Sequence, residues 1–265
     1  MKDLLICGVP IKEIQSVQLE ILKEFDRVCK ECSIEYVLYG GTLLGAIRHG
    51  GFIPWDDDID VAMRRDDYEK FLLLAPDLLD NGFFLQNRFS DQGYDRRYAK
   101  IRKDGTVFIE KEVEGKKIHH GLFIDVFPLD RISDNNVIAG LHSFILYYLF
   151  YIDDHLRNGD LNIPYGNRLT FVMNKIVHKL MTLYVNRQTR RVAQICNSPQ
   201  RWSKRNFNQN VCSDIVLVEY ENLLVPIPRN YHKILSEMYG DYQQPPPPEE
   251  RKTNHSLVKV DLGRN

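Results

Sequence analysis

The sequence predicts a mixed α/β fold with a helical insertion, and three observations lead to this prediction. Apolar side chains recur at helical spacing over residues 11–33. Residues 36–63 follow with a strand pattern, a paired-glycine turn, a short helical pattern and an acidic strand pattern. Long helical patterns with few glycines begin at residue 133. We therefore expect a mixed-sheet core in residues 1–132, a basic helical insertion in residues 133–210, and a C-terminal segment packing back on the core in residues 211–265.

The composition is that of a globular protein, but the charge is unevenly distributed. With 265 residues and 43% hydrophobic residues, the chain can bury a real core and is not expected to be disordered. The net charge is only −1, yet residues 155–205 carry ten Lys or Arg and one Asp. That segment is therefore +9 and the rest of the chain −10, which points to an anionic partner for the basic part.

Cysteine usage and apolar runs indicate where the protein works. The five cysteines show no disulfide framework, and Cys29 and Cys32 fall inside a helical pattern, so we expect reduced thiols in a reducing compartment. The N-terminal residues lack the apolar core of a signal peptide. The apolar-rich part of the longest uncharged run, residues 137–152, has 16 residues, against roughly 20 needed to span a bilayer. The expected location is the cytoplasm, with peripheral contact at the inner face of the cell membrane.

The first helix and strand follow from local patterns. Pro10 suits the first turn of a helix, and the amphipathic pattern after it runs to about Ser33. Residues 37–39 are apolar and β-prone, and Gly40 and Gly41 end the strand that they form. We expect this first helix to cover the sheet.

A short helix and an acidic strand come next. Residues 42–48 suit a helix, which Gly50, Gly51 and Pro54 then break. Residues 58–61 alternate acidic and apolar side chains, the pattern of a strand with one buried face.

One more helix and four strand patterns follow the acidic strand. Acidic residues begin a helix over residues 66–75. Residues 83–86 form a candidate strand, and residues 98–102 and 106–110 flank a Lys-Asp-Gly turn, which predicts a hairpin. Residues 122–127 form an apolar strand that a single carboxylate interrupts.

The remaining residues predict a helical hairpin and a compact tail. Residues 137–152 and 163–192 both have helical patterns, with a turn between them. Strand patterns at residues 214–220 and 224–228, a helix at residues 231–238 and a polyproline stretch complete the chain.

The acidic strand carries the first candidate site. Side chains alternate across a strand, so Asp58 and Asp60 share one face and repel each other unless a cation lies between them. Mg²⁺ or Mn²⁺ with oxygen ligands is the usual solution. The alternative is a solvated acidic face, but four aspartates within five positions of an otherwise buried strand favour the metal site. Asp56, like Trp55, is expected to shape the loop. The N–H groups of a helix that starts after paired glycines approach phosphates, so phosphoryl chemistry is predicted.

A third carboxylate, Asp125, interrupts the apolar strand at residues 122–127. A charge within such a run is rarely buried without a partner. We expect Asp125 beside Asp58 and Asp60, where it completes the metal site or activates an acceptor hydroxyl. His120 forms a polar entrance to this strand, and a contact with donor or acceptor is the further role predicted for it.

Two cations, Lys100 and Arg102, alternate with apolar residues on the strand at residues 98–102. Two interpretations stay open. They balance donor phosphates beside the acidic site, or they lie on the exposed face of a hairpin.

These motifs together resemble the signature of the LicD family. Gly40–Gly45 matches the family's Gly-Gly-Thr-Leu-Leu-Gly run, and Gly51–Asp58 matches its Gly-Phe-Ile-Pro-Trp-Asp run. The segment around Asp125 resembles the family's His-Gly and Asp-Val-Phe-Pro-Leu-Asp pattern. The tail resembles its closing run of Val-Pro-Ile-Pro, Tyr-Gly-Asp-Tyr, prolines and a histidine. The resemblance covers about residues 25–130 and 220–255, and the basic middle carries none of its motifs.

The resemblance implies a nucleotidyltransferase-like fold and a CDP-activated donor. Bacterial members of the family transfer phosphocholine from CDP-choline to surface glycans, whereas fukutin and the fukutin-related protein use CDP-ribitol. Catalytic and metal-binding roles are implied for Asp58, Asp60 and Asp125. Donor or phosphate contacts are implied for Gly40, Gly41, Thr42, Arg48, Lys100, Arg102 and His120.

The resulting prediction is an enzyme that uses Mg²⁺ or Mn²⁺ to transfer a substituted phosphate, phosphocholine in the first place, from a CDP-activated alcohol. The acceptor is a hydroxyl of a cell-surface glycan, as in teichoic-acid or lipopolysaccharide precursors. An anionic or lipid-linked acceptor would meet the basic helical region, where contact with the membrane is also expected. Nucleic acid is not an expected partner, because the chain has no nucleic-acid-binding signature.

Two alternative functions remain. One is a nucleotidyltransferase that moves an NMP from an NTP to a small hydroxyl acceptor, and the other is a glycan-binding protein without turnover. The donor head group also stays open between choline, ribitol, glycerol and ethanolamine.

Overall fold

The computed structural model describes residues 4–157, 172, 176, 189–196 and 206–264. The chain divides into two compact units. Unit 1 consists of Met1–Phe127 and Val211–Asn265, and unit 2 consists of Pro128–Asn210. Strand β8 (Phe123–Ile132) contributes residues to both units.

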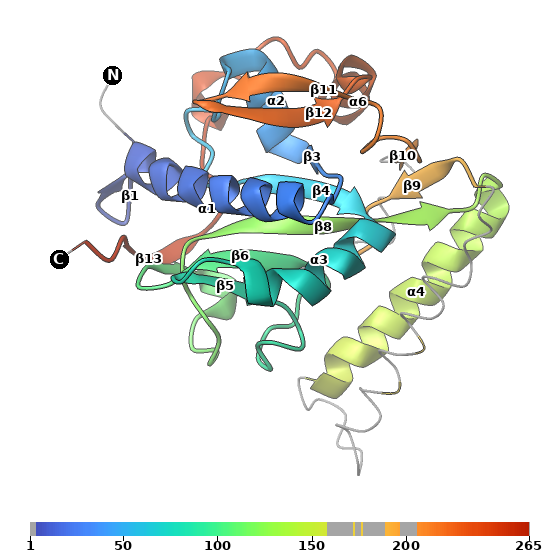
Figure 1. Cartoon of the computed structure of the whole chain (residues 1–265), viewed down its shortest axis with the longest axis horizontal. Helices are drawn as coiled ribbons and strands as arrows, with labels where there is room; N and C mark the ends of the chain where they lie inside the picture. The colour runs from blue at the N-terminus through green and yellow to red at the C-terminus, as the bar shows by residue number, and fades with distance from the viewer. Residues whose placement is uncertain (1–3, 158–171, 173–175, 177–188, 197–205, 265) are drawn as a thin grey trace. The chain divides into compact units, whose positions relative to one another are not determined.

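A mixed sheet forms the centre of unit 1 and confirms the predicted mixed α/β class (Figure 1). Strand β3 pairs antiparallel with β4, and β6 pairs antiparallel with both β5 and β8. The order across unit 1 is therefore β3-β4-β8-β6-β5. The bounds of the four strands other than β8 are Val37–Leu38 (β3), Asp60–Arg64 (β4), Phe83–Gln86 (β5) and Ala99–Lys103 (β6).

Helices α1 (Ile11–Glu31) and α3 (Arg65–Leu78) lie on one face of this sheet (Figure 1). The predicted amphipathic pattern forms the core here, because Ile14, Ile21 and Phe25 are fully buried. Helix α1 packs against β6 and α3. Each large apolar side chain buried in this way stabilises the fold by about 1.5–3 kcal/mol.

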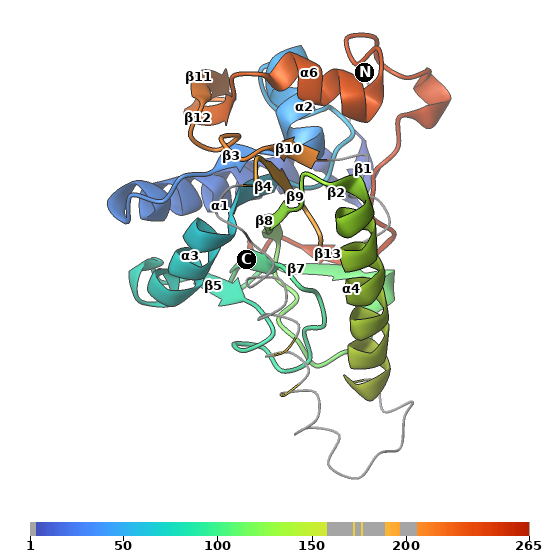
Figure 2. The same cartoon turned by 90° about the vertical axis from the view of Figure 1, so that its right-hand side faces the viewer.

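Helix α2 (Gly40–His49) carries a hairpin on its outer side. The hairpin consists of β11 (Ile215–Tyr220) and β12 (Leu223–Pro228), and α6 (Tyr231–Tyr239) follows it. Both Figure 1 and Figure 2 show α2 beside α6 and this hairpin. Glu221, at the hairpin turn, accepts a hydrogen bond from the Phe52 N–H (3.2 Å) and donates its own N–H to the Gly50 carbonyl (2.8 Å). The turn is thereby fixed to the loop after α2.

The predicted hairpin of residues 98–102 and 106–110 is wrong. Strand β7 (Val107–Glu110) pairs with β13 (Leu257–Asp261), a strand that the sequence analysis did not predict. Residues 120–122 lie between β6 and β7, since the Lys103 N–H donates to the Leu122 carbonyl (2.8 Å) and the Phe108 N–H to the His120 carbonyl (2.6 Å). These residues occupy the place that a hairpin partner would take.

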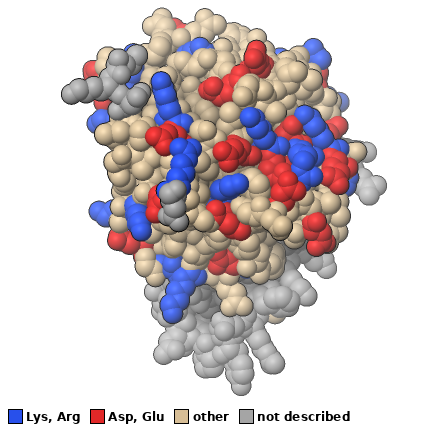
Figure 3. Space-filling view, turned by 60° about the vertical axis from the view of Figure 1, so that its left-hand side comes forward, with Lys and Arg blue, Asp and Glu red and all other residues tan. Residues whose placement is uncertain are grey.

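The remaining elements of unit 1 are short. Strands β1 and β2 precede α1 and pair with each other, and two 3₁₀ turns follow β7 and the polyproline stretch. Their bounds are Leu5–Ile6 (β1), Val9–Pro10 (β2), Lys111–Val113 (η1) and Pro248–Glu250 (η2). On the face drawn in Figure 3, acidic and basic side chains are intermingled.

Unit 2 contains α4 (Asn136–Arg157), β9 (Arg191–Ala193) and β10 (Asn206–Asn208). Helix α4 confirms the first predicted helix of the insertion. Strand β9 pairs antiparallel with β10 and with the end of β8. The predicted second helix, residues 163–192, lies mostly outside the described residues, and its last two residues belong to β9 instead. Among the described residues, no helix combines the length and apolarity needed to span a bilayer.

Candidate active site

The three predicted metal ligands, Asp58, Asp60 and Asp125, lie together in unit 1. The sequence had predicted that Asp58 and Asp60 share one face of a strand. This is wrong, because β4 begins at Asp60 and Asp58 precedes it. The Asp125 N–H donates to the Ile59 carbonyl (2.8 Å), which joins β8 to the acidic residues. Burial, and then the negative charges of Asp58 and Asp125, raise the pKa of Asp60 well above its ordinary value.

Two glutamines of α1 hold the loop that leads into β4. Gln15 Nε2 donates to the carbonyl oxygens of Ile53 (3.3 Å) and Asp56 (2.9 Å), and Gln18 Nε2 donates to that of Asp57 (2.6 Å). These bonds fix the backbone of the loop just ahead of residue 58, where the strand was predicted to begin.

Helix α2 begins against the acidic residues, where no side chain would fit. A Cβ on Gly40 would lie 2.8 Å from Asp60 Oδ2, and one on Gly41 would lie 2.8 Å from Asp56 Oδ2. Gly40 also has a φ of 56°, which favours glycine. Thr42 Oγ1 accepts a hydrogen bond from the Asp60 N–H (2.8 Å). The glycine-led helix start therefore lies at the acidic site, and the phosphate contacts of these residues stay a prediction.

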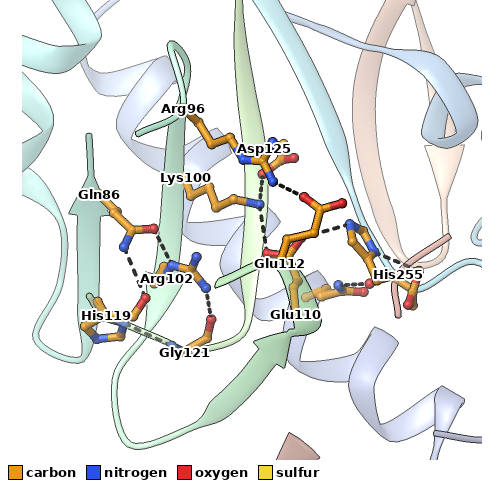
Figure 4. A network of polar contacts seen from close by, with 12 residues as sticks. Gln86, Arg96, Lys100, Arg102, Glu110, Glu112, His119, Gly121, Asp125 and His255 are labelled. Carbon is orange, nitrogen blue, oxygen red and sulfur yellow. Dashed lines mark hydrogen bonds and ion pairs between the residues drawn. The ribbon is translucent and has the colours of Figure 1, made fainter. Parts of the chain in front are cut away.

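A network of alternating acids and cations lies beside the aspartates (Figure 4). Lys100 Nζ is 2.7 Å from Asp125 Oδ1 and 4.0 Å from Glu110 Oε2. His255 Nε2 is 3.6 Å from Glu110 Oε1, and its Nδ1 is 3.1 Å from Asp57 Oδ1. Asp125 and Asp57 are thereby connected through three charged side chains.

The pKa directions within this network follow from burial and from the neighbouring charges. Burial lowers the pKa of Lys100, against the effect of the Asp125 and Glu110 carboxylates. Burial raises the pKa of Glu110, but Lys100 and His255 outweigh it and leave that pKa below its ordinary value. Burial also lowers the pKa of His255, but its hydrogen bond to Asp57 and the nearby carboxylates raise it to about 9. His255 is therefore a cation near neutral pH.

Three consecutive aspartates form a candidate metal centre. Asp56, Asp57 and Asp58 each offer a carboxylate oxygen, and these oxygens lie within 4.8 Å of one another. Burial and the charge of Asp58 raise the pKa of Asp56 to about 8. Asp57 is fully buried, and its Oδ2 has no hydrogen-bond partner among the described residues. A hard divalent cation would neutralise the repulsion between these buried carboxylates and would give Asp57 Oδ2 a partner. The donor set therefore fits Mg²⁺ or Mn²⁺.

Two of the predicted donor contacts, Lys100 and Arg102, are buried inside the sheet. The interpretation of an exposed hairpin face is therefore wrong for both. Arg102 Nε donates to Gln86 Oε1 (2.5 Å), and its Nη1 donates to the Gly121 carbonyl (2.6 Å). These bonds connect β5, β6 and the segment before β8, so the guanidinium of Arg102 stabilises the sheet.

The other two predicted donor contacts, Arg48 and His120, are held by backbone carbonyls. Arg48, in the last turn of α2, donates to the carbonyl of Tyr242 (3.0 Å). His120 Nε2 lies 2.9 Å from the carbonyl of Lys116. His120 was predicted at the polar entrance of a strand that starts at residue 122. The strand β8 begins one residue later, at Phe123, so His120 lies further from its start than predicted.

Glu110 and Asn254 were not predicted as site residues, and His255 was expected only as the closing histidine of a motif. Residues 258–261 alternate apolar and polar side chains, a strand signal that was available in the sequence. The pairing of this strand with β7 brings Glu110 and His255 together, and local patterns do not reveal such a pairing.

Comparison with known proteins identifies the family. The family model described as LicD/FKTN/FKRP, nucleotidyltransferase domain, matches residues 33–171, just over half of the chain. Lipopolysaccharide cholinephosphotransferase LicD of Haemophilus influenzae is 29% identical over 258 residues, which cover 92% of this chain and 96% of that protein. Human ribitol 5-phosphate transferase FKRP is 48% identical over 40 residues, which cover 15% of this chain and 8% of that protein. The chain therefore belongs to the LicD family and is a transferase.

Proposed function

We propose that this transferase moves phosphocholine from CDP-choline to a hydroxyl of a surface glycan, with the help of a divalent cation. The observation that carries the proposal is the meeting of the aspartates with the glycine-led start of α2. Carboxylates for a cation and N–H groups for a phosphate then face one position. The similarity to a lipopolysaccharide cholinephosphotransferase over 92% of the chain supports the choice of phosphocholine.

The aspartates would hold Mg²⁺ or Mn²⁺, with Asp58 and Asp60 as first candidates, Asp125 as a third, and Asp56 and Asp57 added by the geometry. A bound cation supplies neutralisation of charge on the donor diphosphate. The positive end of α2 would face the same diphosphate, because its first residues, Gly40 and Gly41, lie directly against Asp60 and Asp56.

The transfer is an in-line displacement at phosphorus. The acceptor oxygen forms a bond to the phosphorus that carries choline, and the bond from that phosphorus to the bridging oxygen breaks. CMP leaves with the bridging oxygen, and the proton of the hydroxyl passes to a carboxylate, for which Asp125 is the candidate. Such a site works by positioning and charge neutralisation.

The basic helical region would serve the acceptor. Helix α4 buries Ala139, Leu146 and Phe150 in the core of unit 2, yet its other side exposes a second apolar stripe. The exposed residues of this stripe include Val137, Leu141, Phe144, Ile145, Tyr148 and Ile152. Together with the charge of +9 over residues 155–205, this favours contact with an anionic membrane surface that presents a lipid-linked acceptor.

The test is CMP release from the purified chain supplied with CDP-choline and Mg²⁺ or Mn²⁺. CDP-ribitol, CDP-glycerol, CDP-ethanolamine and CTP run in parallel, and a lipid-linked glycan extract supplies acceptors. Asp58→Asn is the inactive variant, and Asp66→Asn, an exposed aspartate on α3, is its matched control.

The outcomes separate the candidate functions. Metal-dependent CMP release from CDP-choline that Asp58→Asn loses and Asp66→Asn keeps supports the proposal. Release from another CDP-alcohol changes the donor. Pyrophosphate from CTP overturns the proposal in favour of nucleotidyl transfer. Glycan binding without turnover by any donor indicates a binding protein.

A further inference from the structure

Two residues that precede β13 contact the acidic loop directly. Asn254 Nδ2 donates to Asp56 Oδ1 (2.7 Å), and the Asn254 N–H donates to Asp57 Oδ1 (3.2 Å). His255 Nδ1 lies 3.1 Å from the same Oδ1 of Asp57. Three donors therefore hold one oxygen from each of two adjacent carboxylates.

The imidazole of His255 has further contacts besides the one to Asp57. Its Nε2 faces Glu110 Oε1 at 3.6 Å. The rings of Phe108 and Phe123 meet it edge to face, with centroids at 6.0 and 5.9 Å. The pairing of β13 with β7 sets the backbone just after it. These contacts fix the orientation of the ring that binds Asp57.

The second oxygens of the two carboxylates are not held by Asn254 or His255. Asp57 Oδ2 is buried and has no hydrogen-bond partner among the residues described. Asp56 Oδ2 points toward the start of α2, where a Cβ on Gly41 would lie 2.8 Å from it. An arrangement with only a structural role would pair Asp57 Oδ2, because an unpaired buried acceptor costs about 1–3 kcal/mol. The pattern leaves this oxygen to a ligand.

We propose that Asn254 and His255 are positioning residues, which bind Oδ1 of Asp56 and Asp57 and thereby aim the two Oδ2 oxygens at the divalent cation. This inference rests on the proposed metal-dependent function and extends it to residues that lie about 200 positions from the motif. Partners that orient metal-binding side chains are worth about 10- to 100-fold in metal affinity or activity.

The experiment measures Mn²⁺ binding to the full chain by electron paramagnetic resonance. Asn254→Asp keeps the shape of the side chain but replaces its amide donor with an acceptor that repels Asp56. Asn87→Asp is the matched control, because Asn87 uses its side-chain oxygen as an acceptor for the N–H groups of Phe89 and Ser90. We expect binding about tenfold weaker for Asn254→Asp and unchanged for Asn87→Asp.

A second pair of variants probes the imidazole. His255→Ala should weaken Mn²⁺ binding by about tenfold, and His255→Gln, which restores a donor, should recover part of the loss. In CMP release, these variants should lower kcat more than they raise KM for CDP-choline. Circular dichroism checks that each variant is folded. Asn254→Ser replaces Asn254→Asp if the latter does not fold.

The outcomes distinguish the proposed positioning by Asn254 and His255, here called the clamp, from the proposed function. Wild-type binding of Mn²⁺ that Asp58→Asn loses, together with the expected losses at positions 254 and 255, supports the inference. Wild-type affinity in folded Asn254→Asp and His255→Ala overturns the clamp and leaves the proposed function in place. Turnover of CDP-choline by a wild-type chain that binds no Mn²⁺ overturns both the clamp and the role of the metal.

Discussion

Lys100 Nζ lies 2.7 Å from Asp125 Oδ1, and both side chains are almost completely removed from solvent. The ammonium group also faces Glu110 and the ring of Phe123, so it is the cation beside the buried Asp125 and one of two cations near Glu110. Removing one partner of a buried pair leaves an uncompensated charge, which is more costly than the net value of the pair.

Lys100→Met should therefore lower the free energy of unfolding by about 3–5 kcal/mol. Lys103→Met, at the end of the same strand, is the control, because its side chain is 28% exposed and its Nζ lies 3.9 Å from the exposed Glu20. The control should change stability by about 1 kcal/mol or less. Urea denaturation followed by circular dichroism measures both. Equal effects of the two substitutions would contradict the role given to Lys100.

Arg102→Lys should lower stability by about 2–3 kcal/mol, because lysine does not reach Gln86 and the Gly121 carbonyl together. Arg264→Lys, at an exposed ion pair with Glu13, should be close to neutral. KM for CDP-choline, measured on folded Arg102→Lys below its melting temperature, should stay near the wild-type value. A large rise in KM without loss of stability would restore Arg102 as a donor contact.

Gly40→Ala should abolish most CMP release, because the new methyl group would collide with Asp60 Oδ2. Gly50→Ala is a matched control, since Gly50 also has a positive φ (68°) but nothing lies within 4 Å of a Cβ there. Both variants should lose about 1–2 kcal/mol of stability from the strained backbone. The difference in activity between them then isolates the close approach at the site. Similar activity in both would refute that requirement.

Without divalent cation, the free energy of unfolding should fall as pH rises from 7 to 9. The pKa of His255 is raised to about 9 from 6.5, and that of Asp56 to about 8 from 3.8. Both groups bind more protons in the folded than in the unfolded chain over this range, so stability decreases with pH. The stabilisation from His255 is complete below about pH 6.5 and is lost as pH rises through 9.

Urea denaturation in EDTA at pH 7, 8 and 9 measures this slope. Saturating Mn²⁺ should flatten it, because the cation favours the ionised carboxylates. His255→Gln should reduce the slope, whereas His232→Gln, on α6, should not change it. A metal-free chain that becomes more stable toward pH 9 would contradict the assignment of the two groups.

Elements with strong local patterns could be predicted from the sequence. The amphipathic repeat of α1 and the strand Phe83–Gln86 form where the pattern indicates. The helix predicted over residues 42–48 also forms, but it begins at Gly40, so the paired glycines are its first residues and not a turn before it. The nearness of Asp125 to Asp58 and Asp60 was also predictable, because a charged side chain in an apolar strand is rarely buried without a partner.

Features that depend on distant partners could not be predicted. The loop before β4 is held by side chains of α1, about 40 positions away, which bind the carbonyls of residues 53, 56 and 57. The burial of Lys100 and the place of β7 depend on strands that are not adjacent in the sequence. Asp56 was predicted only to shape the loop. Its contact with Asn254 could not be predicted, because the two residues are 198 positions apart.

The hydrogen bond between Asp57 and His255 joins residues 198 positions apart, and this separation bears on how the enzyme is made. A ribosome delivers the aspartates long before their cationic partner, so the emerging chain carries Asp57 without the imidazole that binds it. Contacts of such long range are also slow to close. A gene interrupted before residue 254 would therefore retain the entire glycine-aspartate signature and encode a protein whose Asp56 and Asp57 lack the donors of Asn254 and His255.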